Sequence, residues 1–76
     1  MSNSAYTPIS CALHSEYELA IMHKKHLQLS WKQHGSIHHA LLLPIDLLTR
    51  NHAEFLLAQN EDGEEIEIRL DTILDR

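Results

Sequence analysis

The sequence is poor in the residues that build catalytic loops, disulfide frameworks and membrane spans. Its two glycines, Gly35 and Gly63, lie far apart, which excludes a glycine-rich phosphate-binding loop. The one cysteine, Cys11, cannot form an internal disulfide and so favours a reducing compartment. No apolar run is long enough to span a membrane, and the first residues lack the basic-then-apolar pattern of an export signal. We therefore expect a cytoplasmic protein.

The length restricts the chain to one domain. Seventy-six residues allow one small hydrophobic core, with little room for a substrate cavity and the side chains that would support it. Residues 1–5 are small and polar and are expected to be disordered, so the single domain is expected to span residues 6–76. A chain of this size favours a binding module over an enzyme.

The charge is negative and unevenly distributed. Eleven acidic residues face six basic ones, and residues 54–76 hold eight of the acids but two of the bases. This sign repels phosphate backbones and anionic lipid headgroups, so neither nucleic acid nor a membrane is expected as a direct partner. Two interpretations of the acidic end remain open: a solvated edge that keeps the protein soluble, and a surface that attracts a cationic partner.

One helix is expected near the N-terminus. Ser15 and Glu18 match a capping box, which would place Glu16 and Glu18 in the first turn and the basic residues 23–25 in the last. The apolar spacing of Tyr17, Ala20 and Ile21 is helical, and Leu13 joins the same face if the helix starts earlier, with Ser10 as its cap.

The rest of the chain has the pattern of antiparallel strands. Alternating residues 27–32 and 37–43 predict a hairpin that turns at Gly35, and residues 54–59 and 64–70 predict a second hairpin around residues 60–63. Residues 44–53 begin with Pro44 and show no clean period, which predicts an irregular strand end and a loop. The fold class is therefore α+β, mainly β: a helix and four or five strands, curled into a small closed barrel that removes the exposed sheet edges.

The candidate catalytic and metal-binding residues do not form a recognisable site. Seven histidines invite a metal interpretation, but His38 and His39 are adjacent in a predicted strand and point to opposite faces. Cys11 has neither a metal-binding partner nor the glycine-flanked turn of a nucleophile. Trp31, at an inward strand position, is expected in the core. We expect no catalytic residue, no metal and no cofactor.

Several residues in order resemble one known family. They are Tyr6-x-Pro8-Ile9-x-Cys11, Glu18-Leu19-Ala20, Leu27-x-Leu29, Gly35, Asp46-Leu47, Arg50, Glu54-Phe55-Leu56 and Ile68-Arg69-Leu70-Asp71-x-Ile73. Over residues 6–73 this pattern is similar to the Rho-binding antiterminator family, also called Rof or YaeO. The resemblance implies an N-terminal helix followed by a small Sm-like antiparallel β-barrel. It also implies a protein that binds the N-terminal RNA-binding domain of the transcription termination factor Rho, competes with RNA at its primary site and reduces Rho-dependent termination. We expect this protein to be a monomer.

The resemblance also implies which residues contact Rho. The family's contact surface is the start of the helix and the loop before the third barrel strand. In this sequence these segments supply His14, Ser15, Glu16, Glu18, Arg50, Asn51 and His52. Carboxylates on such a surface offer arginine and lysine the charge and acceptors of a phosphate, and so can displace RNA by mimicry. The alternative is an Sm-like module that binds RNA itself, because Sm-like barrels often bind RNA and this chain has a tryptophan and several histidines.

Overall fold

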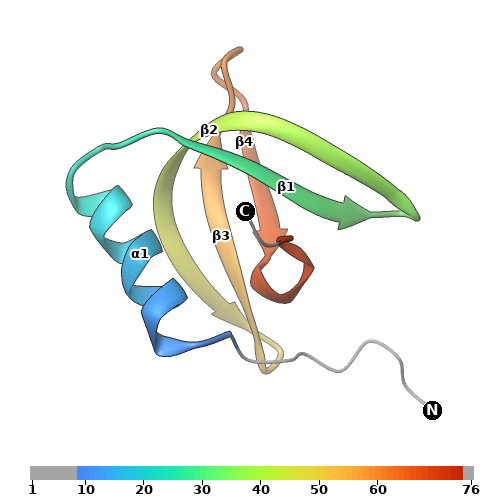
Figure 1. Ribbon diagram of the computed structural model, residues 1–76, viewed down its shortest axis with the longest axis horizontal. Coiled ribbons are helices and arrows are strands. Elements are labelled where there is room, and N and C mark those ends of the chain that lie inside the picture. Colours follow the sequence, from blue (N-terminus) through green and yellow to red (C-terminus); the bar gives the residue numbers. More distant parts are fainter. Residues whose placement is uncertain (1–8, 75–76) are drawn as a thin grey trace.

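The chain folds as one helix followed by a four-stranded antiparallel sheet in the order β1-β2-β3-β4 (Figure 1). This computed structural model describes residues 9–74, so the predicted disorder of residues 1–5 lies outside the described residues. The elements are α1 (Cys11–Met22), β1 (Leu27–Gln33), β2 (Ser36–Arg50), β3 (Ala53–Gln59), β4 (Glu65–Arg69) and the 3-10 helix η1 (Leu70–Thr72). The α+β, mainly β class predicted from the sequence is confirmed.

Helix α1 begins earlier than the capping box at Ser15 predicts. Ser10 is the N-cap, with an extended backbone and a side-chain oxygen that accepts a hydrogen bond from the Leu13 amide at 3.2 Å. The capping box is therefore wrong, and the alternative start at Ser10 is confirmed. Glu16 and Glu18 lie beyond the first turn, which contains no acid, and the last turn contains no base. The expected pairing of these charges with the helix dipole is absent from α1.

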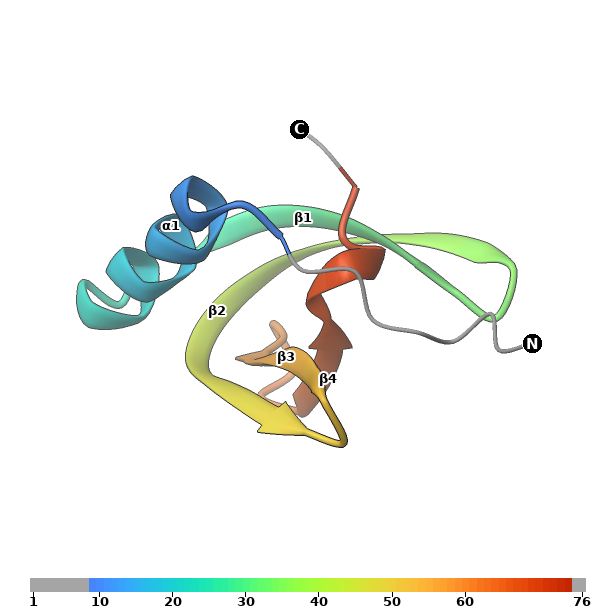
Figure 2. The same ribbon diagram turned by 90° about the horizontal axis from the view of Figure 1, so that it is seen from below.

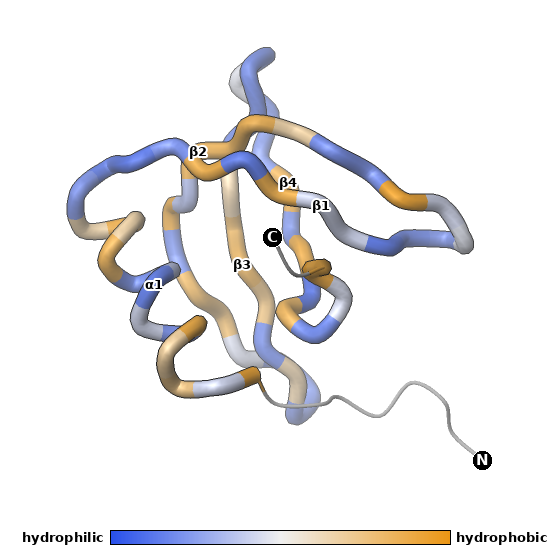
Figure 3. Tube along the Cα trace, viewed as in Figure 1, coloured by the Kyte–Doolittle hydropathy of each residue, from blue (hydrophilic) through white to orange (hydrophobic). Residues whose placement is uncertain are grey.

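The core lies between α1 and the concave side of the sheet (Figures 1 and 2). Tyr17 and Ala20, three residues apart, supply the buried face of the helix, as their helical spacing in the sequence predicts. Hydrophobic residues run along most of β3 (Figure 3), and Leu29, Leu42 and Leu56 are fully buried. Trp31 is 7% exposed, which confirms its predicted place in the core.

Strand β2 continues through Pro44 to Arg50, so the irregular strand end and loop predicted for residues 44–53 are limited to a register shift after Pro44 and a two-residue turn. Its first half pairs with β1 and its second half pairs with β3, with a register shift between Pro44 and Asp46 where the strand bends (Figure 1). A proline is tolerated at such an irregularity because the missing amide falls where the ladder is already interrupted. The connection to β3 is the two-residue turn Asn51–His52, whose φ angles are 52° and 66°. This left-handed backbone matches the twist of a tight hairpin.

The second hairpin, β3 and β4 around residues 60–64, is confirmed. After η1 the chain returns to β1, where Ile73 forms an isolated antiparallel bridge with Trp31 and the Leu74 amide donates to the Ser30 carbonyl at 2.7 Å. Within residues 9–74 no ladder joins β4 to β1, so the sheet is an open one of four strands.

Candidate functional site

His14 connects helix α1 to the beginning of β3. Its Nε2 lies 3.4 Å from Glu54 Oε2, and its Nδ1 lies 3.8 Å from Glu18 Oε2, one turn further along the helix. Glu54 is the second residue after the β2–β3 turn. The predicted contact surface on α1 therefore lies against β3, the strand that follows the predicted contact loop at residues 50–52. We call His14, Glu18 and Glu54 the α1–β3 acidic cluster.

The two predicted helix acids lie on different sides of α1. Glu18, with 58% of its side chain exposed, borders a shallow groove between the helix and β2. Glu16 is also exposed, but it borders a groove on the β1 side, with His23, Lys25 and Leu27 among its neighbours. Ser15 is exposed between them. Because residues two positions apart on a helix point in widely different directions, Glu16 and Glu18 cannot meet one small basic group together.

Arg50 lies on the opposite face of the sheet from Glu54. Paired residues of an antiparallel ladder share a face, and the register pairs Arg50 with Ala53 but Thr49 with Glu54. Arg50 Nη2 donates a hydrogen bond to Glu67 Oε2 at 2.8 Å, and its guanidinium lies 5.3 Å from the centre of the Phe55 ring. The hydrogen bond and charge of Glu67 raise the pKa of Arg50 above its ordinary value. The structure thus separates Arg50 from the α1–β3 acidic cluster.

Asn51 and His52 form the exposed tip of the β2–β3 turn. Both have a left-handed backbone, which Asn tolerates better than His because its short polar side chain can interact locally. The tip presents an amide and an imidazole to solvent, beyond the end of the ladder. These groups can donate and accept hydrogen bonds.

Sequence reasoning missed two acids that belong to this region. Glu54 completes the cluster around His14, and Asp46 borders the same groove as Glu18, together with Ile21, Met22 and Leu47. Met22 is 70% exposed, so the groove offers apolar as well as acidic surface. The feature that could have identified Glu54 is the length of the β2–β3 turn. A two-residue turn pairs Glu54 with Thr49, on the side of β2 that faces the helix.

Two of the seven histidines have partners on opposite faces of the β1–β2 hairpin. The His38 ring stacks on Trp31, and His39 Nδ1 lies 2.7 Å from Ser30 Oγ. In residues 9–74 no group of three His, Cys, Asp or Glu side chains is arranged to hold a metal ion. Nor is any helix in this part of the chain long and apolar enough to cross a membrane.

A scan of the sequence against models of known protein families found no match, and a search of curated proteins found none either.

Proposed function

We propose that this chain binds the N-terminal RNA-binding domain of the termination factor Rho, occupies its primary RNA site and so reduces Rho-dependent termination. The proposal joins the resemblance to the Rho-binding antiterminator family with one observation. That observation is the position of His14 between Glu18 of α1 and Glu54 of β3, which brings the two acids into one acidic cluster.

The cluster has the chemistry that an RNA-binding groove recognises. Glu18 and Glu54 place two carboxylates on either side of one imidazole, at 3.8 and 3.4 Å from its nitrogens. Arginine and lysine side chains that bind phosphate form charge-assisted hydrogen bonds with carboxylates in the same way. The net charge of −5 adds a longer-range attraction to a basic groove and opposes direct binding to RNA.

Each implied contact residue has a proposed role that its position supports. Glu18 is the main anion, His14 positions it beside Glu54, and Asn51 and His52 add hydrogen bonds from the turn tip. Ser15 and Glu16 form a second rim on the β1 side of the helix. Arg50 holds the end of β2 against β4 through its hydrogen bond to Glu67, and its contribution to binding Rho is therefore indirect. The protein acts as a monomer, without catalysis or a cofactor.

We also propose that the fold is a small Sm-like barrel. The bridge between Trp31 and Ile73 and the hydrogen bond from Leu74 to Ser30 bring the end of the chain to the free edge of β1. The bend of β2 at Pro44 turns one strand from one side of the core to the other, as a small barrel requires. Both features support a barrel in which residues 73–74 serve as a short last strand.

The alternative, an RNA-binding Sm-like module, has less support. Such modules stack bases on exposed aromatic rings, whereas Trp31 is 7% exposed and His38 stacks against it with ring centroids 5.6 Å apart. An aromatic ring that is already covered offers no platform for a base. We therefore favour the binding of Rho over the binding of RNA.

The proposal is tested by measuring the binding of RNA to Rho with and without the chain, and the binding of RNA to the chain alone. With labelled single-stranded RNA and purified Rho, the chain should lower the fraction of RNA bound to Rho, and the chain alone should leave the RNA mobility unchanged. Unchanged occupancy of Rho, or a mobility shift by the chain alone, would contradict the proposal.

Paired variants locate the surface. Glu18→Gln with Glu54→Gln should weaken inhibition about tenfold, because two charge-assisted contacts are lost. The control, Asp62→Asn with Glu65→Gln, removes the same charge from the exposed β3–β4 hairpin and should weaken inhibition about twofold through the general field. Equal effects of the two pairs would mean that net charge, and not the α1–β3 acidic cluster, determines binding.

A further inference from the structure

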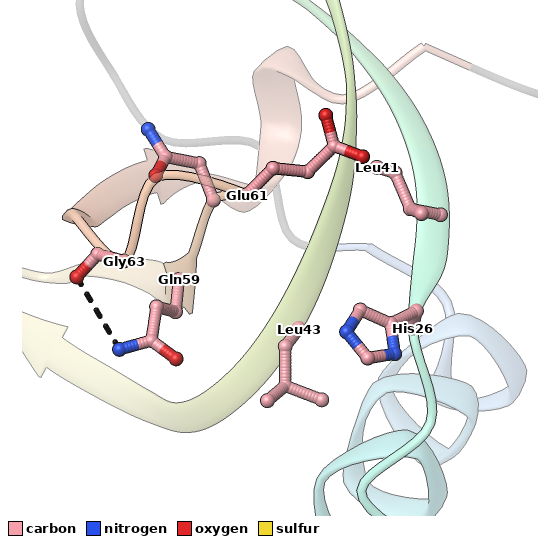
Figure 4. Close-up of a pocket in the computed structure, with 7 residues that line it drawn as sticks. His26, Leu41, Leu43, Gln59, Glu61 and Gly63 are labelled. Carbon is pink, nitrogen blue, oxygen red and sulfur yellow. Dashed lines mark hydrogen bonds between the residues drawn. The ribbon is translucent and has the colours of Figure 1, made fainter.

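A pocket lies at the opposite end of β3 from the α1–β3 acidic cluster. It has a volume of about 460 Å³ and is formed by segments that are distant in sequence. Figure 4 shows its walls: His26 before β1, Leu41 and Leu43 from β2, Gln59 at the end of β3, and Glu61 and Gly63 from the β3–β4 loop. The loop wall is polar and the β2 wall is apolar.

The loop wall is held in place by Asn60. Its Oδ1 accepts hydrogen bonds from the Asp62 and Glu64 amides, both at 2.9 Å, and its Nδ2 donates to the Glu64 carboxylate at 3.1 Å. The Gly63 amide also donates to the Asn60 carbonyl at 3.0 Å. These bonds fix the loop backbone and occupy Glu64. The pocket therefore exists before a ligand arrives, which lowers the entropic cost of binding.

Apart from the His26 imidazole, which can donate or accept, the side-chain groups left for a ligand are acceptors. Gln59 Nε2 donates to the Gly63 carbonyl at 3.3 Å, which leaves the amide oxygen of Gln59 facing the Leu43 side of the pocket (Figure 4). The Glu61 side chain extends from the loop toward Leu41 (Figure 4). Among the described residues, no hydrogen bond or ion pair engages the Glu61 carboxylate. A ligand that satisfies both groups must donate hydrogen bonds, and a charged donor is preferred beside a carboxylate.

The apolar wall and the surrounding charge further restrict the kind of ligand that fits this pocket. Leu41, 38% exposed, and the half-buried Leu43 offer a surface for an aliphatic chain below the acceptors. Residues 61–67 contain five acids and no base, so the field at the pocket attracts cations. An arginine side chain combines the aliphatic stem, the positive charge and a planar head with several donors in a fixed geometry.

We propose that this pocket binds an arginine side chain presented by a partner protein. The aliphatic stem packs on Leu41 and Leu43, and the guanidinium donates hydrogen bonds to the Glu61 carboxylate and the Gln59 amide oxygen. The site is separate from the α1–β3 acidic cluster, so the inference does not depend on the proposed binding to Rho.

The probe is the blocked peptide acetyl-Gly-Arg-Gly-amide, followed by amide chemical shifts of the full chain. The peptide should shift the resonances of Leu41, Leu43 and residues 59–63, with the weak, saturable binding of a single side chain. The matched control replaces arginine by citrulline, which has the same stem and shape without the charge, and should cause no saturable shift. A lysine peptide should bind several-fold more weakly, because an ammonium lacks the planar set of donors.

Two variants of the loop test the assigned contacts. Glu61→Gln should weaken the arginine peptide about tenfold, whereas Asp62→Asn, in the same loop but outside the pocket lining, should weaken it about twofold or less. Neither change removes a buried group, so both variants should fold.

Three results would overturn the proposal: citrulline binding as well as arginine, lysine binding as tightly as arginine, or equal effects of the two variants. Shifts confined to residues of α1 would overturn it as well, because they would place the arginine at the other surface.

Discussion

Trp31 and His38 face each other across the β1–β2 hairpin, with ring centroids 5.6 Å apart and ring planes inclined by 20°. They are direct partners in the antiparallel register, so the contact is a cross-strand pair on the core side of the hairpin. His38 covers the one tryptophan of the chain. The pair extends the core toward the exposed end of the hairpin, where His34 and Gly35 form the turn.

Replacement of His38 by Ala should expose the Trp31 ring. We expect an increase in the quenching of tryptophan fluorescence by acrylamide and a loss of about 0.5 kcal/mol in the free energy of unfolding, the size of a cross-strand aromatic pair. Because the chain has one tryptophan, the signal reports this site alone. His39→Ala, on the other face of the same strand, is the control and should leave the quenching unchanged. Equal quenching in both variants would mean that His38 does not shield the ring.

The helix cap allows a direct comparison of two serines. Ser10→Ala removes the side chain that accepts from the Leu13 amide and should lower the free energy of unfolding by about 1 kcal/mol, or the Tm by about 4–8 °C for a domain of this size. Ser15→Ala, on the exposed helix interior, should leave the Tm unchanged or slightly raised, because Ala has the higher helix propensity. Thermal unfolding followed by circular dichroism measures both. A larger loss for Ser15→Ala would place the helix start at Ser15.

The same two serines illustrate how far the sequence could define the helix. The spacing of Tyr17 and Ala20 predicted the helix and its buried face, because a 3.6-residue period is a property of the local sequence. The start was ambiguous, since both serines have the chemistry of a cap. The longer helix brings Leu13 onto the core beside Tyr17, and this tertiary packing favours Ser10 over a local capping box.

Strand β2 and the candidate surfaces depended on contacts that are distant in sequence. Pro44 looked like the end of a strand because proline interrupts a ladder, but it lies where β2 changes partner from β1 to β3. The resemblance placed His14 and Glu18 in the site, whereas Glu54 joined it through the register of the β2–β3 hairpin. Arg50 could not be assigned to a face without that register, and it turned out to pair with Glu67.

The β2–β3 turn should tolerate glycine better than its native histidine. His52 has a φ of 66°, a left-handed conformation that strains most side chains but not glycine. We expect His52→Gly to raise the free energy of unfolding by about 0.5–1 kcal/mol, and Asn51→Gly to raise it less, because Asn tolerates this region. Urea unfolding measures both changes. A lower free energy of unfolding for His52→Gly would contradict this prediction, because it would mean that contacts of the imidazole outweigh the backbone strain.

The proposed complex with Rho should weaken as salt is added. The attraction combines the net charge of −5 with close contacts of Glu18 and Glu54, and salt screens the first more than the second. Between about 50 and 300 mM salt we therefore expect the Kd for Rho to rise several-fold, mainly through a slower association rate, because long-range steering acts on encounter. Surface plasmon resonance separates the two rates. In the Glu18→Gln/Glu54→Gln variant the dissociation rate should be faster at every salt concentration, because close contacts resist dissociation. A variant that changed the association rate alone would show that these carboxylates attract Rho from a distance without touching it.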